Sequence, residues 1–336
     1  MSLVSFGDMA QFQTLRRQGI SLRSDLARLT AELSSGKIED KGRAVGGDFS
    51  TLADITRGLR LNETYRNSIA NAAIFATGRQ SALERVADEL DGFGASLMSL
   101  TGMEQVNSLR LDPLDAPERF DAAVRALNTR VAGQSIFAAD APEATPLANS
   151  DTILTELRTV IAGATDAASV DALVTAWFND TGGGYETFAW QGGEGVPLET
   201  LLGEADATNS GVSALDPAVR ETLTALALAT LASDEPSPLL ADEREALIAI
   251  SGQKVLNSET SLVALRARIG SEEAHIEEAK VAAEAARGAM ELEYGRLVDA
   301  DPYRTATELE AVTLQLESLY ILTARMSRLN LTEFLR

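Results

Sequence analysis

Residues 252–298 read GQKVLNSETSLVALRARIGSEEAHIEEAKVAAEAARGAMELEYGRLV, and this stretch decides the fold. A set of mostly apolar or small residues, which also includes two glutamates, recurs at alternating intervals of three and four residues. The set is Val255, Ser258, Leu262, Leu265, Ile269, Glu272, Ile276, Ala279, Ala283, Ala286, Met290, Glu293 and Leu297. This spacing places one stripe along one side of an α-helix. At 1.5 Å per residue such a helix would be about 70 Å long, more than a compact domain needs.

Both ends of the chain carry stripes of the same kind. Gly36 follows the N-terminal stripe and is predicted to end its helix, and Asp301-Pro302 precedes the C-terminal stripe and is predicted to start the next helix. The N-terminal stripe contains Phe12, Leu15, Gly19, Leu22, Leu26, Leu29 and Leu33, and the C-terminal stripe contains Leu309, Val312, Leu316, Leu319, Thr323 and Met326, followed by Phe334. The two ends are therefore predicted to be helices that pack through these stripes.

A second long helix is predicted to start near Thr51. Its stripe contains Leu52, Ile55, Leu59, Ile69, Ala73, Ala76, Leu83, Ala87, Leu90 and Leu97, with Asn62, Arg66 and Gln80 at stripe positions. Polar residues in such a stripe lower stability but fix register and partner choice. A shorter helix is expected from about Asp115 to Gly133.

The charge of the chain is concentrated in its middle. Residues 1–110 carry 13 basic and 13 acidic side chains, residues 111–250 carry 6 and 23, and residues 251–336 carry 10 and 14. An acidic middle repels nucleic acid and anionic lipid, so neither nucleic acid nor membrane is an expected partner. Cysteine is absent, which excludes disulfides and thiolate metal sites.

The middle also differs in its pattern. Helical spacing is found at 150–162 and 215–232, and between them the glycine-flanked stretch from Tyr185 to Trp190 indicates a strand. The predicted fold is therefore mainly α: a long antiparallel coiled-coil or helical bundle formed by both termini, with an inserted mixed α/β central domain. The predicted divisions are 1–139, 140–250 and 251–336.

Catalytic and metal chemistry find little support in the sequence. Glu272 and His275 have the Glu-x-x-His spacing of di-iron helical bundles, but such a site needs two copies and His275 is the only histidine. A solvated helix face is the simpler interpretation. With His275 on that face, no other histidine is left to act as the base in Ser-His-Asp or Cys-His catalysis, so such catalysis would need an unusual base. Tyr185, Phe188 and Trp190 are better explained as the small core of a β element than as a sugar-binding face. We expect no enzyme activity, no metal and no cofactor.

The terminal stripes are the predicted functional site. The inner helices can bury their stripes against one another within the chain, whereas the stripes at the extreme termini need partners, and other copies of the chain are the simplest supply. The predicted assembly interface consists of Phe12, Leu15, Leu22, Leu26, Leu29, Leu33, Leu309, Val312, Leu316, Leu319, Met326 and Phe334.

Three stretches of the helical ends resemble the flagellin family. They are Leu33-Ser34-Ser35-Gly36-Lys37 after the first stripe, Leu127–Gly133 followed by Ile136-Phe137 and Thr145-Pro146, and Val298–Tyr303 followed by Ala306–Leu309. Two departures stand out. Ile38-Glu39-Asp40 replaces the usual Arg-Ile-Asn, and the ending Asn330–Arg336 lacks the Pro-Gln pair of the filament subunits. The second departure favours the hook-associated members of the family.

The resemblance implies a structural subunit that joins the flagellar hook to its filament by polymerising through terminal helices. It also implies an extracellular place on the bacterial flagellum, reached through the flagellar type III apparatus without a cleaved signal peptide. Expected partners are further copies of the chain, a neighbouring hook-associated protein, flagellin and an export chaperone. The filament subunit itself is the alternative, and a binding module or enzyme carried on a coiled-coil stalk is a third interpretation.

Overall fold

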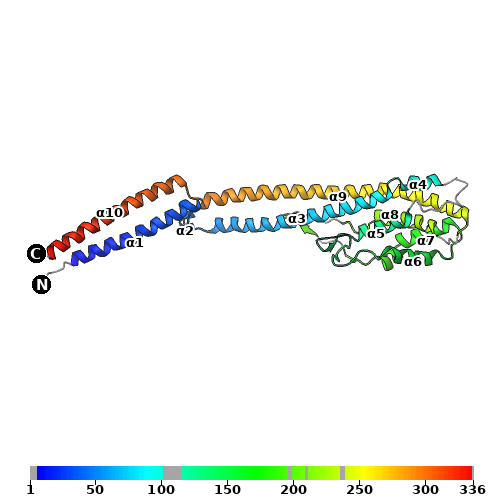
Figure 1. The fold of residues 1–336 in the computed structure, drawn as a ribbon, viewed down its shortest axis with the longest axis horizontal. Coiled ribbons are helices and arrows are strands. Elements are labelled where there is room, and N and C mark those ends of the chain that lie inside the picture. The colour runs from blue at the N-terminus through cyan, green and yellow to red at the C-terminus, as the bar shows by residue number, and fades with distance from the viewer. Residues whose placement is uncertain (1–5, 101–114, 196–198, 209–210, 235–238, 335–336) are drawn as a thin grey trace. The chain divides into compact units, whose positions relative to one another are not determined.

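The computed structural model describes residues 6–100, 115–195, 199–208, 211–234 and 239–334, without the side chains of 6–9, 11–12 and 326–334. Its long helices are α1 (Phe6–Ser35), α3 (Ser50–Leu90), α9 (Ala241–Val298) and α10 (Pro302–Phe334) (Figure 1). The shorter ones are α2 (Lys41–Ala44), α4 (Phe93–Leu100), α5 (Ala116–Leu127), α6 (Ser150–Ile161), α7 (Ala167–Asn179), η2 (Tyr185–Ala189) and α8 (Pro217–Ser233).

The chain divides into two compact units. Unit 1 combines residues 1–62 with 285–336, and unit 2 comprises residues 63–284. Unit 1 therefore contains α1, α2 and α10 with the adjoining ends of α3 and α9, while unit 2 contains the remaining elements. The predicted fold class, mainly α with long helices from both termini and a central insert, is confirmed.

Strands play a minor part among the described residues. β1 (Arg130–Val131) pairs antiparallel with β2 (Gln134–Ser135), and β3 (Thr200–Leu201) pairs antiparallel with β4 (Ala207–Thr208). The turn between β1 and β2 has two successive residues with positive φ, Ala132 at 50° and Gly133 at 82°. Such a backbone matches the twist of a two-residue hairpin.

The predicted stripe of α9 is buried over much of its length. Val255, Leu262, Leu265, Ile269, Ile276, Ala279 and Ala283 are buried, and in unit 2 the last three pack with Ile69, Ala72 and Ala76 of α3. The helix begins earlier than predicted, at Ala241, and its 58 residues span about 87 Å. Small alanines at these positions let two helix backbones approach closely.

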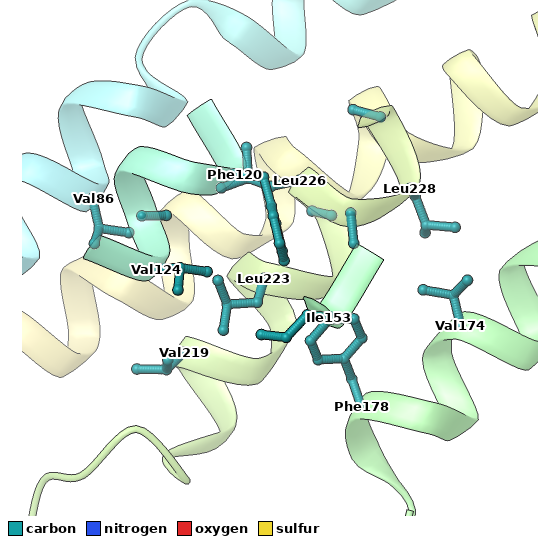
Figure 2. Packing of buried hydrophobic residues seen from close by; sticks show 14 of the residues in the cluster. Val86, Phe120, Val124, Ile153, Val174, Phe178, Val219, Leu223, Leu226 and Leu228 are labelled. Atoms are coloured by element: carbon teal, nitrogen blue, oxygen red, sulfur yellow. The ribbon is translucent and has the colours of Figure 1, made fainter. Parts of the chain in front are cut away.

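The core of unit 2 surrounds α8. This helix is apolar on all sides, as its sequence TALALATLA indicates, and nearly every residue from Ala218 to Ala232 is buried. Figure 2 shows Leu223 and Leu226 of α8 among Phe120 and Val124 of α5, Ile153 of α6 and Phe178 of α7. The same cluster includes Leu83, Val86 and Leu90 of α3 and Leu262, Leu265 and Ile269 of α9.

The segment 140–250 thus shares one core with residues on both sides of it. α5 lies before the predicted insert, yet its Phe120, Val124 and Leu127 are buried with α6, α7 and α8. The three-part division at 139 and 250 stays a prediction.

The predicted strand from Tyr185 to Trp190 is wrong. Residues Tyr185–Ala189 form a wide helical turn, η2, and only Trp190 makes an isolated bridge, to Leu147. Tyr185 and Ala189 are buried and Phe188 is exposed, which is helical rather than alternating spacing. The Tyr185 ring packs against Trp177 and Phe178, and its hydroxyl donates to the Ala214 carbonyl at 2.6 Å. Burial raises the pKa of this hydroxyl well above its usual value.

Within the part of the chain that the structure describes, no helix combines the length and the apolar character needed to cross a bilayer.

Candidate assembly surface

The candidate site is the pair of helices α1 and α10, which lie side by side in unit 1 (Figure 1). α1 ends at Ser35, and Gly36 directly after it has a φ of 69°, a left-handed conformation that glycine adopts without strain. α10 begins at Pro302 behind Asp301, whose carboxylate accepts hydrogen bonds from the backbone N–H groups of Tyr303 (2.9 Å) and Arg304 (3.2 Å). Both predicted helix boundaries are confirmed.

Backbone hydrogen bonds fasten the end of α1 to the connection between α9 and α10. The Gly36 carbonyl accepts from the Ala300 N–H at 2.9 Å, and the Ile38 N–H donates to the Val298 carbonyl at 2.8 Å. These bonds join residues far apart in sequence, so they set the register in which α1 and α10 meet.

The two predicted terminal stripes face one another within a single chain. Leu29, Leu316 and Leu319 are buried, and Leu15, Leu22, Leu26, Leu309 and Val312 are half-buried. Leu33 is 40% exposed, so it contributes little to this contact. Phe12, Met326 and Phe334 have side chains outside the described part, and their predicted role stays a prediction. The role of the whole set in assembly between copies also stays a prediction.

A close approach lies within this contact, and a polar pair lies at its exposed edge. A Cβ atom on Gly19 would lie 3.2 Å from Leu319 Cδ2, which is tighter than ordinary van der Waals contact. Arg23 Nε and Nη2 donate to the Tyr320 hydroxyl at 3.1 and 2.9 Å, and the guanidinium lies 5.7 Å from the centre of that ring. A groove of about 350 Å³ opens beside them, with Leu15 and Ile20 in its wall.

A buried carboxylate holds the loop that follows α1. Glu32 Oε1 accepts from Arg28 Nη1 at 3.1 Å and from the backbone N–H of Glu39 at 3.2 Å. Arg28 also pairs with Asp25, at 3.4 Å. The pKa of Arg28 is raised: desolvation would lower it, but its hydrogen bonds and charge interactions with Glu32 and Asp25 outweigh that effect. A charge-assisted bond to a buried acceptor stiffens the turn at the base of the hairpin.

The sequence analysis did not predict the polar pairs Arg23–Tyr320 and Arg28–Glu32, nor a second set of apolar side chains on α10. Tyr303, Leu314 and Ile321 of α10 are exposed on the side of that helix that faces away from α1, and Ile20 of α1 is exposed at the edge of the groove beside the hairpin. The signal was available, because positions 303, 307, 310, 314, 317 and 321 also follow three-four spacing. The Arg28–Glu32 pair has the i, i+4 spacing of a helical ion pair.

Glu272 and His275 both lie on α9, but each contacts a different residue outside that helix. Glu272 Oε1 lies 3.8 Å from Arg79 Nη1. Burial raises the pKa of the Glu272 carboxyl, and the charge of Arg79 opposes that rise. Its side chain is only 11% exposed, so the predicted solvated face is wrong at this position. His275 Nε2 lies 2.9 Å from Asp206 Oδ1 at an exposed position. Among the described residues, no group of three or more His, Asp or Glu side chains is arranged to hold a metal ion.

No protein-family model matches the chain, and no curated protein matches it in sequence. The solved structure of a putative flagellar hook-associated protein from Vibrio parahaemolyticus is similar to it, with a TM-score of 0.52 and 12% sequence identity. The similarity covers 73% of this chain and 94% of that one. At such low identity, the likeness establishes that the chain shares a fold with the Vibrio parahaemolyticus protein.

Proposed function

We propose that the chain is a structural subunit of the bacterial flagellum that joins hook to filament and assembles through the α1–α10 hairpin. The observation that carries the proposal is the hairpin of α1 and α10. One apolar stripe is buried between the two helices, and further apolar side chains are exposed on the surface of the hairpin. A two-helix hairpin with exposed Ile20, Leu314 and Ile321 gains stability when neighbouring copies cover those side chains.

Two further observations support the flagellar assignment. One is the fold shared with the Vibrio parahaemolyticus protein, which covers nearly the whole of that chain. The other is the resemblance of Leu33–Lys37 and Val298–Tyr303 to the ends of flagellins.

The proposal implies partners and a route. The subunit contacts further copies of itself, a neighbouring hook-associated protein on one side and flagellin on the other. It leaves the cell through the flagellar type III apparatus with the help of an export chaperone, and acts outside the cell without catalysing a reaction. A chain without cysteine suits that route, because no disulfide can form before it is threaded through the channel.

Deleting the gene in the bacterium that encodes the chain tests the proposal. We expect cells that build hooks, lack filaments and release flagellin into the medium, and we expect an intact copy of the gene to restore motility. Hooks without filaments and without flagellin in the medium would identify the chain as the filament subunit. Normal filaments in the deletion strain would contradict a flagellar role.

A further inference from the structure

The side of α1 that faces away from α10 is small, apolar and cationic. Opposite the buried stripe, helical spacing places Arg17, Ser24, Ala27 and Ala31, with Ile20 at the edge of the set, where it also lines the groove beside the hairpin; all five are exposed. Ile20 is 61% exposed. Arg16 is exposed at the margin of this set. These residues are called the α1 outer face below.

The side of α10 that faces away from α1 is apolar and anionic. The corresponding set contains Tyr303, Thr307, Glu310, Leu314 and Ile321, with Glu317 at its margin, and all of them are exposed. Leu314 and Ile321 are 63% and 55% exposed. These residues are called the α10 outer face below.

The two outer faces have opposite charge. In the sequence, residues 13–24 contain Arg16, Arg17 and Arg23 and no acidic residue, whereas the α10 outer face carries Glu310 and Glu317. Glu308, off this face, pairs with Arg304 at 3.5 Å. Arg23 is exposed and bonds to the exposed Tyr320 of the same chain, and Arg16 and Arg17 are also exposed. The faces are therefore complementary to each other, and neither is complementary to itself.

Unit 1 as a whole is electrically neutral. It carries 15 basic and 15 acidic residues, whereas unit 2 carries 14 and 35. Hairpins of neighbouring copies can thus approach without net repulsion. Charge patterns of this kind contribute little affinity, but they select partner and orientation.

We propose that the α1 outer face of one copy packs against the α10 outer face of the next copy. This inference rests on the proposed function and names the surface through which copies meet. Opposite charges favour the α1–α10 contact, and like charges oppose α1–α1 and α10–α10 contacts. The contact is heterologous, because each copy contributes a different face, so it builds a ring or a helical array rather than a closed dimer.

The absence of cysteine from the chain makes engineered disulfides a direct test. Ile20→Cys protein is mixed with Leu314→Cys protein, or with Ile321→Cys protein, at a concentration where sedimentation velocity shows that the wild type associates. The two α10 positions are one heptad apart, about 10 Å, so together they sample the stagger between copies. Mild oxidation should give a two-copy product in at least one mixture and none from any variant alone. A chain carrying both cysteines should give a ladder of larger products.

Thr30→Cys mixed with Leu314→Cys, and Ile20→Cys mixed with Gln315→Cys, are matched controls. Thr30 and Gln315 are exposed but lie off the outer faces, so neither mixture should crosslink. Crosslinking of Ile20→Cys protein with itself would mean isologous pairing and would overturn the inference. Association without a product in either test mixture would also overturn it, while leaving self-assembly intact. Failure of the wild type to associate under any condition would overturn this inference, whereas the deletion phenotype decides the proposed function separately.

Discussion

Gly19 of α1 and Leu319 of α10 are in such close contact that a single added methyl group on Gly19 would lie 3.2 Å from Leu319 Cδ2. The two residues are 300 positions apart in sequence, yet they fix the distance between the two terminal helices. Glycine is otherwise costly inside a helix, by about 0.5–1 kcal/mol relative to alanine. Its presence at position 19 is explained by this close approach.

Gly19→Leu should therefore push the terminal helices apart. We expect it to destabilise the hairpin by about 1–3 kcal/mol, as overpacking usually does. Adding Leu319→Ala in the same chain should recover part of the loss, because it makes room for the new side chain. Hydrogen exchange of α1 and α10 amides measures the effect. Gly288→Leu is the control, since a Cβ there meets nothing within 4 Å; equal damage from both glycine changes would contradict the close-approach argument.

A charge in the buried stripe should abolish assembly while unit 2 stays folded. Leu316→Asp places a carboxylate without a cation at a buried position, at a cost on the order of several kcal/mol. Leu26→Asp does the same at a half-buried position, with a smaller effect. Sedimentation velocity should show monomers, while circular dichroism should show the unfolding transition of unit 2 unchanged.

Thr30→Asp and Gln315→Asp serve as controls for the stripe, because they add the same charge at exposed positions. Both should assemble. Loss of assembly in these variants, or normal assembly of Leu316→Asp, would show that the stripe is not what holds the terminal helices together.

Phe120→Ala should destabilise unit 2 although Phe120 precedes the segment that the sequence marks as an insert. Its ring is buried against α8, as Figure 2 shows, so its loss should cost about 3–5 kcal/mol. Leu226→Ala, within the segment 140–250, should lower the same thermal transition. Phe188→Ala, at an exposed ring, should change the Tm little. Two separate transitions, each sensitive to only one of the core changes, would mean that 140–250 folds independently.

Glu259→Gln should stabilise unit 2 near neutral pH and lose this advantage in acid. Glu259 Oε1 is buried without a hydrogen-bond partner among the described residues, and burial, followed by the charge of Asp91, raises the pKa of this carboxyl above 4.5. The folded chain then binds this proton more tightly than the unfolded chain, so stability falls as pH rises from about 4.5 through the folded pKa. Glutamine removes that loss.

Thermal unfolding of the wild type and of Glu259→Gln at several pH values measures this difference. The gap in Tm should grow from pH 4 to pH 7. A gap that stays constant with pH would place the cause in something other than the titration of Glu259.

The sequence was sufficient for the long helices because their stripes are continuous and their ends carry strong local signals, Gly36 and Asp301-Pro302. It was insufficient at Tyr185 because a short aromatic stretch between glycines fits either spacing, and only the ring contacts with Trp177 and Phe178 decide it. Glu272 was misjudged for a similar reason: its partner, Arg79, lies 193 positions earlier in the sequence, on another helix.

The candidate site was predicted in part. The inner stripes of α1 and α10 follow from heptad spacing, and the structure brings most of the described members together. The pair of Arg23 and Tyr320 depends on the register between two distant helices, which the bonds of Gly36 and Ile38 set. The outer faces can be assigned only once the inner stripes are known to face each other within one chain.

Electron microscopy of intact flagella with a gold-labelled antibody against the purified chain tests the central claim most directly. Label is expected at the boundary between hook and filament and at no other place on the flagellum. Label along the length of the filament would identify the chain as the filament subunit. Flagella without label, in cells that produce the chain, would contradict the account.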